Sequence, residues 1–392
     1  MTGRPGYQTG GEPDDSSQPH AGAARVGPRL RMARQTRGFS QQQLAGMAGV
    51  SRQAVSAVES GLSDPSLRVA LALSRALGMT VEELFGPATP EPVVAVRPVA
   101  PLGEPGARVS LAPVGDSIVA MPLSGPTVAR AGFAPAGGRV TGDDIVVPLG
   151  PPRPTLVVAG CDPALPLLEA PLSLLEPPVS FLWWPCASQQ ALNLARNGLV
   201  HAAGAHLRGS PGEYNTAAAA DFLPAGAEVI GFCSWREGLV LRPDLAGTIG
   251  SVADLAGAGL RLVNREPGAE ARRVLDRELA RHAIAAGDLA GYQTQATGHL
   301  EVAAAIAAGL ADAGIASEPA ALAYELAFVP LAQERFDLVV PASQAASREV
   351  QGLLRALTSP WLHDQLASLP GYSVSQCGER LATVGGAGPA RS

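Results

Sequence analysis

Residues 39–61, FSQQQLAGMAGVSRQAVSAVESG, constrain the fold of this chain more than any other segment. Ser40 is a good N-cap for one helix, and Gln43 stands at the capping-box position three residues later. Gly49 can adopt the left-handed conformation that ends this helix. Ser51 is then suited to cap a second helix. The segment therefore predicts two short helices joined by a tight turn, and the alternative is an ordinary hairpin of a helical bundle.

The residues on both sides extend this helical pattern. An arginine-rich helix around Leu30 precedes the segment, and Ser66 is placed to cap a strongly apolar helix after the turn SDPSL. We expect helices over residues 41–47, 52–60, 66–77 and 81–85. With these flanks, residues 25–86 resemble the Xre/Cro family of lambda-repressor-like helix-turn-helix DNA-binding domains along their whole length.

The resemblance implies how this segment would contact double-stranded operator DNA. In that family the second helix enters the major groove and the first helix crosses the backbone. By position, Arg52, Gln53 and Ser56 should face base edges, since arginine suits guanine and glutamine suits adenine. Polar groups at a helix N-terminus suit phosphate. The implied DNA-contacting residues are Arg37, Ser40, Gln41, Ser51, Arg52, Gln53 and Ser56.

The distribution of charge fits a DNA-binding head on a different kind of body. The net charge is −6, but residues 21–87 carry eight arginines against four acidic residues. The first twenty residues contribute about −2, so residues 88–392 carry about −8. A basic head is thus expected next to an acidic body.

Composition restricts the remaining classes of protein. Hydrophobic residues make up 46% of the chain, enough for a large core beyond the helical head. The four cysteines form no CxxC pair or zinc-finger pattern and are expected to be mostly buried thiols in a reducing cytosol. We find no uninterrupted apolar run of membrane-spanning length, and the polar first twenty residues do not resemble a signal peptide. We therefore expect a cytoplasmic protein without a membrane partner.

Changes in composition along the chain predict several segments. Prolines are dense after the helical head, and turn residues then separate short strand-like runs such as RVTGDDIVVPL. We expect a multidomain fold with an all-α head, a small β-rich linker element and an α/β body. The expected boundaries are a disordered tail at 1–24, the DNA-binding domain at 25–87, a Pro-rich linker at 88–107, the β element at 108–150, the body at 155–375 and a second disordered tail at 376–392.

From residue 155 onward the pattern alternates between strands and helices. TLVVAG has the composition of a buried strand, SQQALNLARNG of a capped helix and LRLVNRE of another strand. Such alternation favours a mostly parallel sheet with helices on both faces. The expected strands cover 155–160, 179–185, 199–207, 228–244, 260–266, 310–317 and 326–342, and the main helices cover 188–198, 251–257, 268–284 and 299–309.

Several separated motifs carry a second resemblance. In order, WREGLVLRPD, LRLVNREPGAEARRVLDREL, HLEVAAAIAAGLADAGI and FVPLAQERFDLVV resemble the periplasmic-binding-protein-like substrate-binding domain of cytosolic regulators, which includes a molybdate-binding type. The resemblance covers roughly residues 155–372. It implies a two-lobed body whose lobes are joined by crossing strands near 234–241 and 330–339, with a small-molecule effector held between them.

Candidate effector-binding groups lie where strands lead into helix N-termini, because free N–H groups there favour anions. The candidate ligand-binding residues are Cys161, Asp162, Ser188, Gln189, Trp235, Asn264, Arg265, Gly268 and Arg272. Where relatives usually have a Gly-Ser-Gly-Thr-Arg run, residues 268–272 are Gly-Ala-Glu-Ala-Arg, which replaces hydroxyls with a carboxylate. An oxyanion such as molybdate and an organic effector therefore both remain possible.

No residue pattern predicts catalysis, a cofactor or a metal site. The chain has no GxSxG, HExxH, Walker A or GxGxxG motif. His201 and His206 are five residues apart, which places them on neither one helix face nor one strand face. We expect a homodimeric, effector-responsive transcriptional regulator. The alternative is a DNA-binding protein whose body is a dimerisation or partner-docking platform without a ligand.

Overall fold

The computed structural model describes residues 26–86, 92–125, 134–209 and 213–385. The chain forms two compact units, residues 1–92 and 93–392, which are described separately. The tail expected at 1–24 lies outside the described residues, as does the stretch 386–392. Among the helices that are described, none combines the length and the apolar character needed to cross a membrane.

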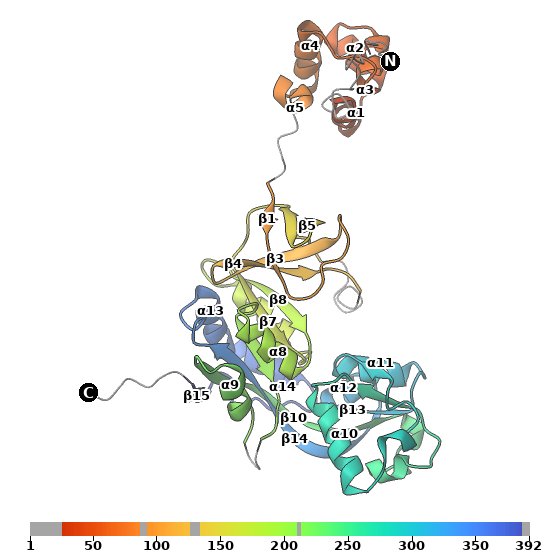
Figure 1. Ribbon diagram of the computed structural model, residues 1–392, viewed down its shortest axis with the longest axis vertical. Helices are drawn as coiled ribbons and strands as arrows, with labels where there is room; N and C mark the ends of the chain where they lie inside the picture. Colours follow the sequence, from red (N-terminus) through yellow and green to blue (C-terminus); the bar gives the residue numbers. More distant parts are fainter. Residues whose placement is uncertain (1–25, 87–91, 126–133, 210–212, 386–392) are drawn as a thin grey trace, which may run out of the picture. The chain divides into compact units, whose positions relative to one another are not determined.

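The first unit is a bundle of short helices (Figure 1). The Ser40 hydroxyl and the Gln43 side chain form the expected capping box, and Gly49 ends the helix at φ 63°. The Ser51 hydroxyl accepts the N–H of Ala54 and so caps the next helix. The helix–turn–helix is therefore confirmed. The described helices are α1 Val26–Thr36, α2 Gln41–Ala48, α3 Arg52–Glu59, α4 Leu67–Leu77 and α5 Val81–Phe85.

The second unit begins with a six-stranded sheet of order β1-β6-β5-β3-β4-β2. Its strands are β1 Val94–Ala95, β2 Arg97–Pro98, β3 Arg108–Val114, β4 Ser117–Pro122, β5 Gly138–Gly142 and β6 Ile145–Pro148. The linker expected over 88–107 is therefore too long, because residues 94–98 already pair with the sheet. Val96 is buried in the same core as Val109. Burial of this apolar side chain favours packing against the sheet over the free, extended linker that the nearby prolines suggested.

The body contains a nine-stranded sheet in which β12-β11-β13-β10-β14-β9-β7-β8 are neighbours and β15 pairs with β10. Neighbouring strands within a lobe, such as β7 and β9 or β11 and β13, are parallel. The long strands β10 and β14 are antiparallel to each other and to β13 and β9. The expectation of a mostly parallel sheet thus holds inside the lobes and is wrong where they join. The strands are β7 Thr155–Gly160, β8 Ser180–Pro185, β9 Ala202–Ala205, β10 Ala227–Leu241, β11 Leu262–Arg265, β12 Gln295–Ala296, β13 Ala313–Ser317, β14 Ala327–Pro341 and β15 Arg380–Val384.

Two long strands join the lobes. β10 and β14 each have 15 residues and pair with each other from Ala227 opposite Pro341 to Leu241 opposite Ala327. Figure 1 shows both strands running from the lobe that contains β7 to the lobe that contains β13. The crossings expected near 234–241 and 330–339 are therefore confirmed.

Helices cover the sheet in both lobes. The first lobe has two cores, one around Leu192 and one around Leu353, and the β element contributes Val119 to the former. The second lobe has its own two cores, around Leu275 and Val302. The α-helices are α7 Glu169–Ser173, α8 Ser188–Arg196, α9 Thr216–Phe222, α13 Arg348–Leu357 and α14 Pro360–Ser368 in the first lobe, and α10 Glu270–Arg281, α11 His299–Ala307 and α12 Glu318–Ala323 in the second. Short 3-10 helices are η2 Leu165–Leu168, η3 Pro243–Leu245, η4 Val252–Leu255 and η5 Ala286–Asp288.

The expectation of a disordered tail from residue 376 is wrong for residues 376–385. Cys377 is buried, and β15 pairs with β10 over residues 380–384. Val384 packs into the core of the first lobe, where it adds apolar contact to the backbone hydrogen bonds of the strand pair. A short strand of this kind gives little signal on its own, because its stability comes from its partner.

Candidate functional site

The exposed face of α3 carries the residues expected to contact base edges. Arg52, Gln53 and Ser56 are exposed, whereas Val55 and Val58 are buried in the helical core. The three polar side chains therefore belong to the solvent side of the helix, the side that a major groove would meet. Their contacts with individual bases stay a prediction.

The residues expected to contact phosphate are partly engaged within the head. Ser51 and Ser40 are exposed caps whose oxygens accept backbone N–H groups, so each hydroxyl proton can still be donated. Arg37 is exposed and donates to a carbonyl of α1 at 3.2 Å. Gln41 donates to Glu59 Oε2 at 2.9 Å, which fixes its amide nitrogen against α3. These phosphate contacts also stay a prediction.

A buried ion pair, absent from the sequence-based prediction, connects α1 to α3. Arg34 Nε and Nη2 donate to Glu59 Oε1 and Oε2 at 2.6 and 3.0 Å. Arg34 Nη1 also donates to the carbonyl of Phe39 at 2.7 Å. The Glu59 side chain is completely buried. The pair thus sets the position of the helix that carries Arg52 and Gln53.

We expect the head to lose stability in acid because of Glu59. Burial raises the pKa of this carboxyl, but hydrogen bonds from Arg34 and Gln41 outweigh it and leave the pKa below its ordinary value. Its stabilising contribution is therefore full above the unfolded pKa of about 4.3 and is lost as the pH falls through the lower folded pKa. Hydrogen exchange of residues 26–59, corrected for the intrinsic rate at each pH, should show falling protection only below about pH 4.5. Glu59→Gln should remove this acid-dependent step.

In the body, three side chains with metal-binding donor atoms meet beside the crossing strands. Cys161 follows β7 and His206 follows β9 in the first lobe, while His299 begins α11 in the second. One donor atom of each lies within 4.8 Å of the other two. All three residues are buried. We call the following six residues the interlobe cluster: Cys161, His206, Glu237, Arg265, His299 and Glu334.

The two histidine rings meet at the indole of Trp235. The His206 and His299 ring centroids are 5.6 Å apart and lie 5.5 and 5.8 Å from that of Trp235. Within the described residues, three ring nitrogens have no hydrogen-bond partner: Nδ1 and Nε2 of His206, and Nε2 of His299. Burial lowers the pKa of His206 to about 3 and that of His299 well below its ordinary value, so both rings are neutral at pH 7. Neutral imidazoles with unpartnered nitrogens are available to a ligand.

Two carboxyl groups of the crossing strands are buried in the same region without full hydrogen bonding. Glu237 Oε2 accepts from Trp235 Nε1 at 3.3 Å, but within the described residues Glu237 Oε1 and both oxygens of Glu334 have no partner. Glu334 is opposite Trp235 in the strand pair, on the same face of the sheet as Glu237. Burial raises the pKa of Glu237 to about 7 and that of Glu334 to about 8.

Arg265, at the end of β11, is the cation of the interlobe cluster. It is completely buried, and Nε and Nη2 donate to Glu266 Oε2 and Oε1 at 2.8 and 3.0 Å. Its Nη1 lies 3.3 Å from His299 Nδ1. Glu266 therefore already balances this positive charge, whereas in the described part of the chain no guanidinium is hydrogen-bonded to Glu237 or Glu334.

Asp162 is fully buried beside Cys161 but uses its oxygens within the first lobe. It accepts hydrogen bonds from the Ala164 N–H at 2.7 Å, the Tyr372 hydroxyl at 2.9 Å and the Cys233 thiol at 3.1 Å. Burial raises its pKa, and these hydrogen bonds oppose the rise. This network fixes the loop that carries Cys161.

The structure places the other predicted ligand-binding residues around the cluster. Ser188 is buried and accepts the N–H of His206 at 3.2 Å. Gln189 is exposed, and its Oε1 would lie 3.3 Å from a Cβ built on Gly268, so these two residues face each other from different lobes. Gly268 has φ +90°, which a side chain would strain.

Asn264 and Arg272 are engaged inside the second lobe. Asn264 donates to the carbonyl of Tyr292 and accepts the N–H of Arg265. Arg272 donates to the Arg265 carbonyl at 3.0 Å, and its guanidinium lies 4.8 Å from the Tyr292 ring centroid. Both side chains hold the end of β11 in place, and a direct ligand contact for them stays a prediction.

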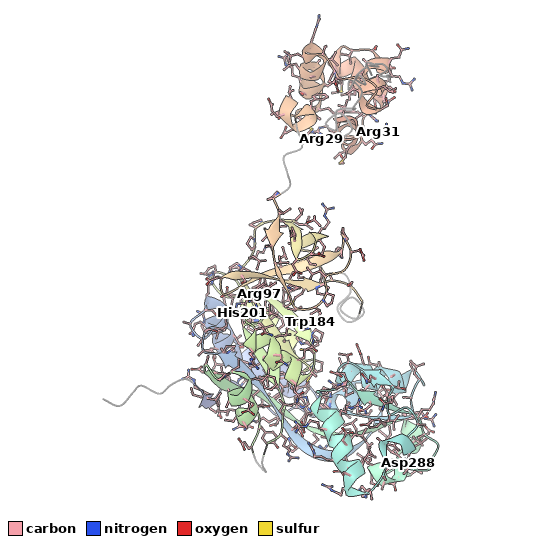
Figure 2. All side chains as sticks on the ribbon, viewed as in Figure 1. Arg29, Arg31, Arg97, Trp184, His201 and Asp288 are labelled. Carbon is pink, nitrogen blue, oxygen red and sulfur yellow. The ribbon has the colours of Figure 1, made fainter. Side chains whose placement is uncertain are left out.

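The two histidines discussed in the sequence have separate environments. His201, labelled in the first lobe in Figure 2, accepts the Val157 N–H through Nδ1 at 3.0 Å. His206 instead belongs to the interlobe cluster. Glu237, His299 and Glu334 were absent from the sequence-based candidates, although charged residues within the apolar runs of the crossing strands could have pointed to the two glutamates.

Comparisons with known proteins assign both parts of the chain. A family described as helix-turn-helix matches residues 30–84, and one described as the PBP superfamily domain matches residues 170–358. The HTH-type transcriptional regulator MJ0272 of Methanocaldococcus jannaschii is 37% identical over 57 residues, which cover 14% of this chain and 86% of that protein.

Other similarities concern the body. The Bacillus subtilis protein YvgK is 31% identical over 144 residues, or 37% of this chain; the match spans 46% of the length of YvgK. Among solved structures, the CcmR regulatory domain of Synechocystis PCC6803 in complex with 2-PG aligns at 16% identity with a TM-score of 0.40, over 51% of this chain and 94% of that one.

Proposed function

Because the chain belongs to the helix-turn-helix transcriptional regulators and carries a periplasmic-binding-protein-like body, we propose that it controls transcription in response to a small molecule bound at the interlobe cluster. The head binds operator DNA through α3. The body binds the effector between its lobes, which each contribute groups to the cluster. We propose a cytoplasmic homodimer that contacts two operator half-sites about one helical turn apart.

The unpartnered buried groups of the interlobe cluster support this assignment most directly. A buried polar atom without a hydrogen bond costs about 1–3 kcal/mol, and His206, Glu237, His299 and Glu334 together have several such atoms. A scaffold that only joined partners would gain stability from apolar residues at these positions. A ligand that completes the hydrogen bonds or coordination of these polar side chains would explain why they are buried there.

The position of the cluster connects ligand binding to the arrangement of the lobes. Cys161 and His206 are in one lobe and His299 is in the other, so a molecule that contacts all three stabilises the arrangement in which the lobes meet. A coupling of about 1–3 kcal/mol between this arrangement and DNA binding is sufficient for regulation.

A thermal-shift screen of the full chain tests the effector site. Molybdate, tungstate, sulfate, divalent metal ions and a panel of organic metabolites are the probes, and an effector at 100 times its Kd should stabilise the body by about 2.7 kcal/mol. We expect the shift to shrink in Glu334→Gln and to persist in Glu228→Gln, whose side chain pairs with Arg380 instead. An equal shift in both variants would place the effector elsewhere, and no shift with any probe would favour the platform alternative.

A further inference from the structure

We propose that Cys161, His206 and His299 form a binding site for a single transition-metal ion of the zinc class, which joins the two lobes. The proposal rests on the function proposed above and names the chemistry of the effector. It departs from the sequence-based expectation, which included no metal ligand. The reason is topological: the three residues are up to 138 positions apart and come together only where the ends of β7 and β9 meet the start of α11.

The donor set and its burial match the coordination chemistry of such ions. One thiolate and two neutral imidazoles are ligands that Zn²⁺ and related ions prefer, with Zn–S near 2.3 Å and Zn–N near 2.0–2.1 Å. In a tetrahedral site these lengths separate the donor atoms by about 3.3–3.6 Å. The present separations, up to 4.8 Å, would therefore close by about 1 Å when the ion binds. The fourth position would be left for water or another ligand.

His299 also has the kind of neighbour that supports a metal-bound imidazole. Its Nδ1 lies 3.6 Å from the unpartnered Oε1 of Glu237, while its unpartnered Nε2 is on the other side of the ring. Nδ1 now accepts the Ser317 N–H at 3.2 Å and lies 3.3 Å from Arg265 Nη1, so the ring proton is on Nε2. Metal binding through Nε2 requires the other tautomer, in which the Ser317 N–H and Arg265 Nη1 lose Nδ1 as an acceptor and Nδ1–H donates to Glu237 Oε1, which orients the ring. The Cys161 thiol exchanges its S–H bond for a metal–sulfur bond and releases the proton to water.

The balance of charge favours a cation over an anion at this site. The guanidinium of Arg265 is already paired with Glu266 through two hydrogen bonds. The carboxyl groups of Glu237 and Glu334 have unpartnered oxygens instead. A buried anion would hold these carboxyl groups in their neutral form, whereas a divalent cation would favour their ionised form and would be balanced by their charge. An oxyanion or a carboxylate is therefore the disfavoured occupant and serves as an alternative outcome of the test.

Equilibrium dialysis of the full chain against Zn²⁺ and absorption spectroscopy with Co²⁺ test the site. We expect one Zn²⁺ per chain and, with Co²⁺, the charge-transfer band of a thiolate ligand. Cys161→Ser should remove this band, and His206→Gln and His299→Gln should each weaken Zn²⁺ binding by more than about tenfold. Cys377→Ser is the matched control, because that thiol is also buried but donates to the Leu357 carbonyl, outside the cluster.

Two outcomes would overturn the metal site. One is a wild-type chain that retains no Zn²⁺; the other is Zn²⁺ binding that is the same in Cys161→Ser as in wild type. Loss of the folded body in a variant is detected by circular dichroism, and the Co²⁺ band of the unmodified protein then still decides the question. A chain that binds no Zn²⁺ but whose operator affinity responds to an organic compound or an oxyanion overturns the metal site while leaving the proposed regulatory function standing.

Discussion

Replacing Arg52 and Gln53 with alanine together should abolish discrimination between operator DNA and unrelated DNA. Each bidentate contact with a base contributes about 1–3 kcal/mol of discrimination. If the two contributions add, the double variant loses about 2–6 kcal/mol, which brings specific binding near the level of non-specific binding. Competition binding with an operator selected from random sequences measures this ratio directly.

The matched control is Arg75→Ala, which removes an exposed arginine from α4 rather than from α3. Arg75→Ala should leave sequence discrimination unchanged. Like the double variant, it loses one positive charge and therefore some salt-dependent affinity for DNA. Full discrimination by the double variant would show that α3 does not enter the major groove as assigned.

Glu59→Ala should unfold the helical head and thereby abolish DNA binding. The substitution leaves Arg34 buried without its carboxylate, and breaking a buried ion pair in this way costs about 3–5 kcal/mol. This cost is comparable to the whole stability of a domain as small as residues 26–86. Hydrogen-exchange mass spectrometry of the full chain should show protection lost in residues 26–86 and retained in the body.

A paired substitution separates the ion pair from general damage to the core. Arg34→Met combined with Glu59→Leu removes both charges and restores apolar packing, so it should recover much of the lost protection. Unchanged protection in Glu59→Ala would mean that the ion pair has little influence on the head. If the paired variant fails to recover protection, the hydrogen bonds from Arg34 to the Phe39 carbonyl and from Gln41 to Glu59, which it also removes, are needed as well.

Local sequence signals predicted most of the elements but not all of their ends. The caps Ser40 and Ser51 and the run TLVVAG each specify an element through nearby residues, and the structure has those elements where they were expected. Residues 94–98 and 380–384 were missed as strands, because their conformation depends on pairing with strands distant in sequence.

The interlobe cluster could not be predicted in full for the same reason. Cys161 and Arg265 were found because one follows a recognisable strand and the other ends one, and ligand-binding residues in α/β folds lie at the carboxyl ends of strands. His299 has no such local signal, since its meeting with His206 depends on how the two lobes come together across β10 and β14. That the Gly-Ala-Glu-Ala-Arg run at 268–272 has altered an anion site stays a prediction.

Effector-controlled DNA binding is tested most directly by the operator affinity of the full chain, measured with and without a ligand that stabilises the body. Saturating ligand should change the Kd for operator DNA by about 5- to 150-fold, and operator DNA should change the ligand affinity by the same factor. An operator Kd that stays the same with every ligand that binds the body would contradict the claim that this protein is an effector-responsive regulator.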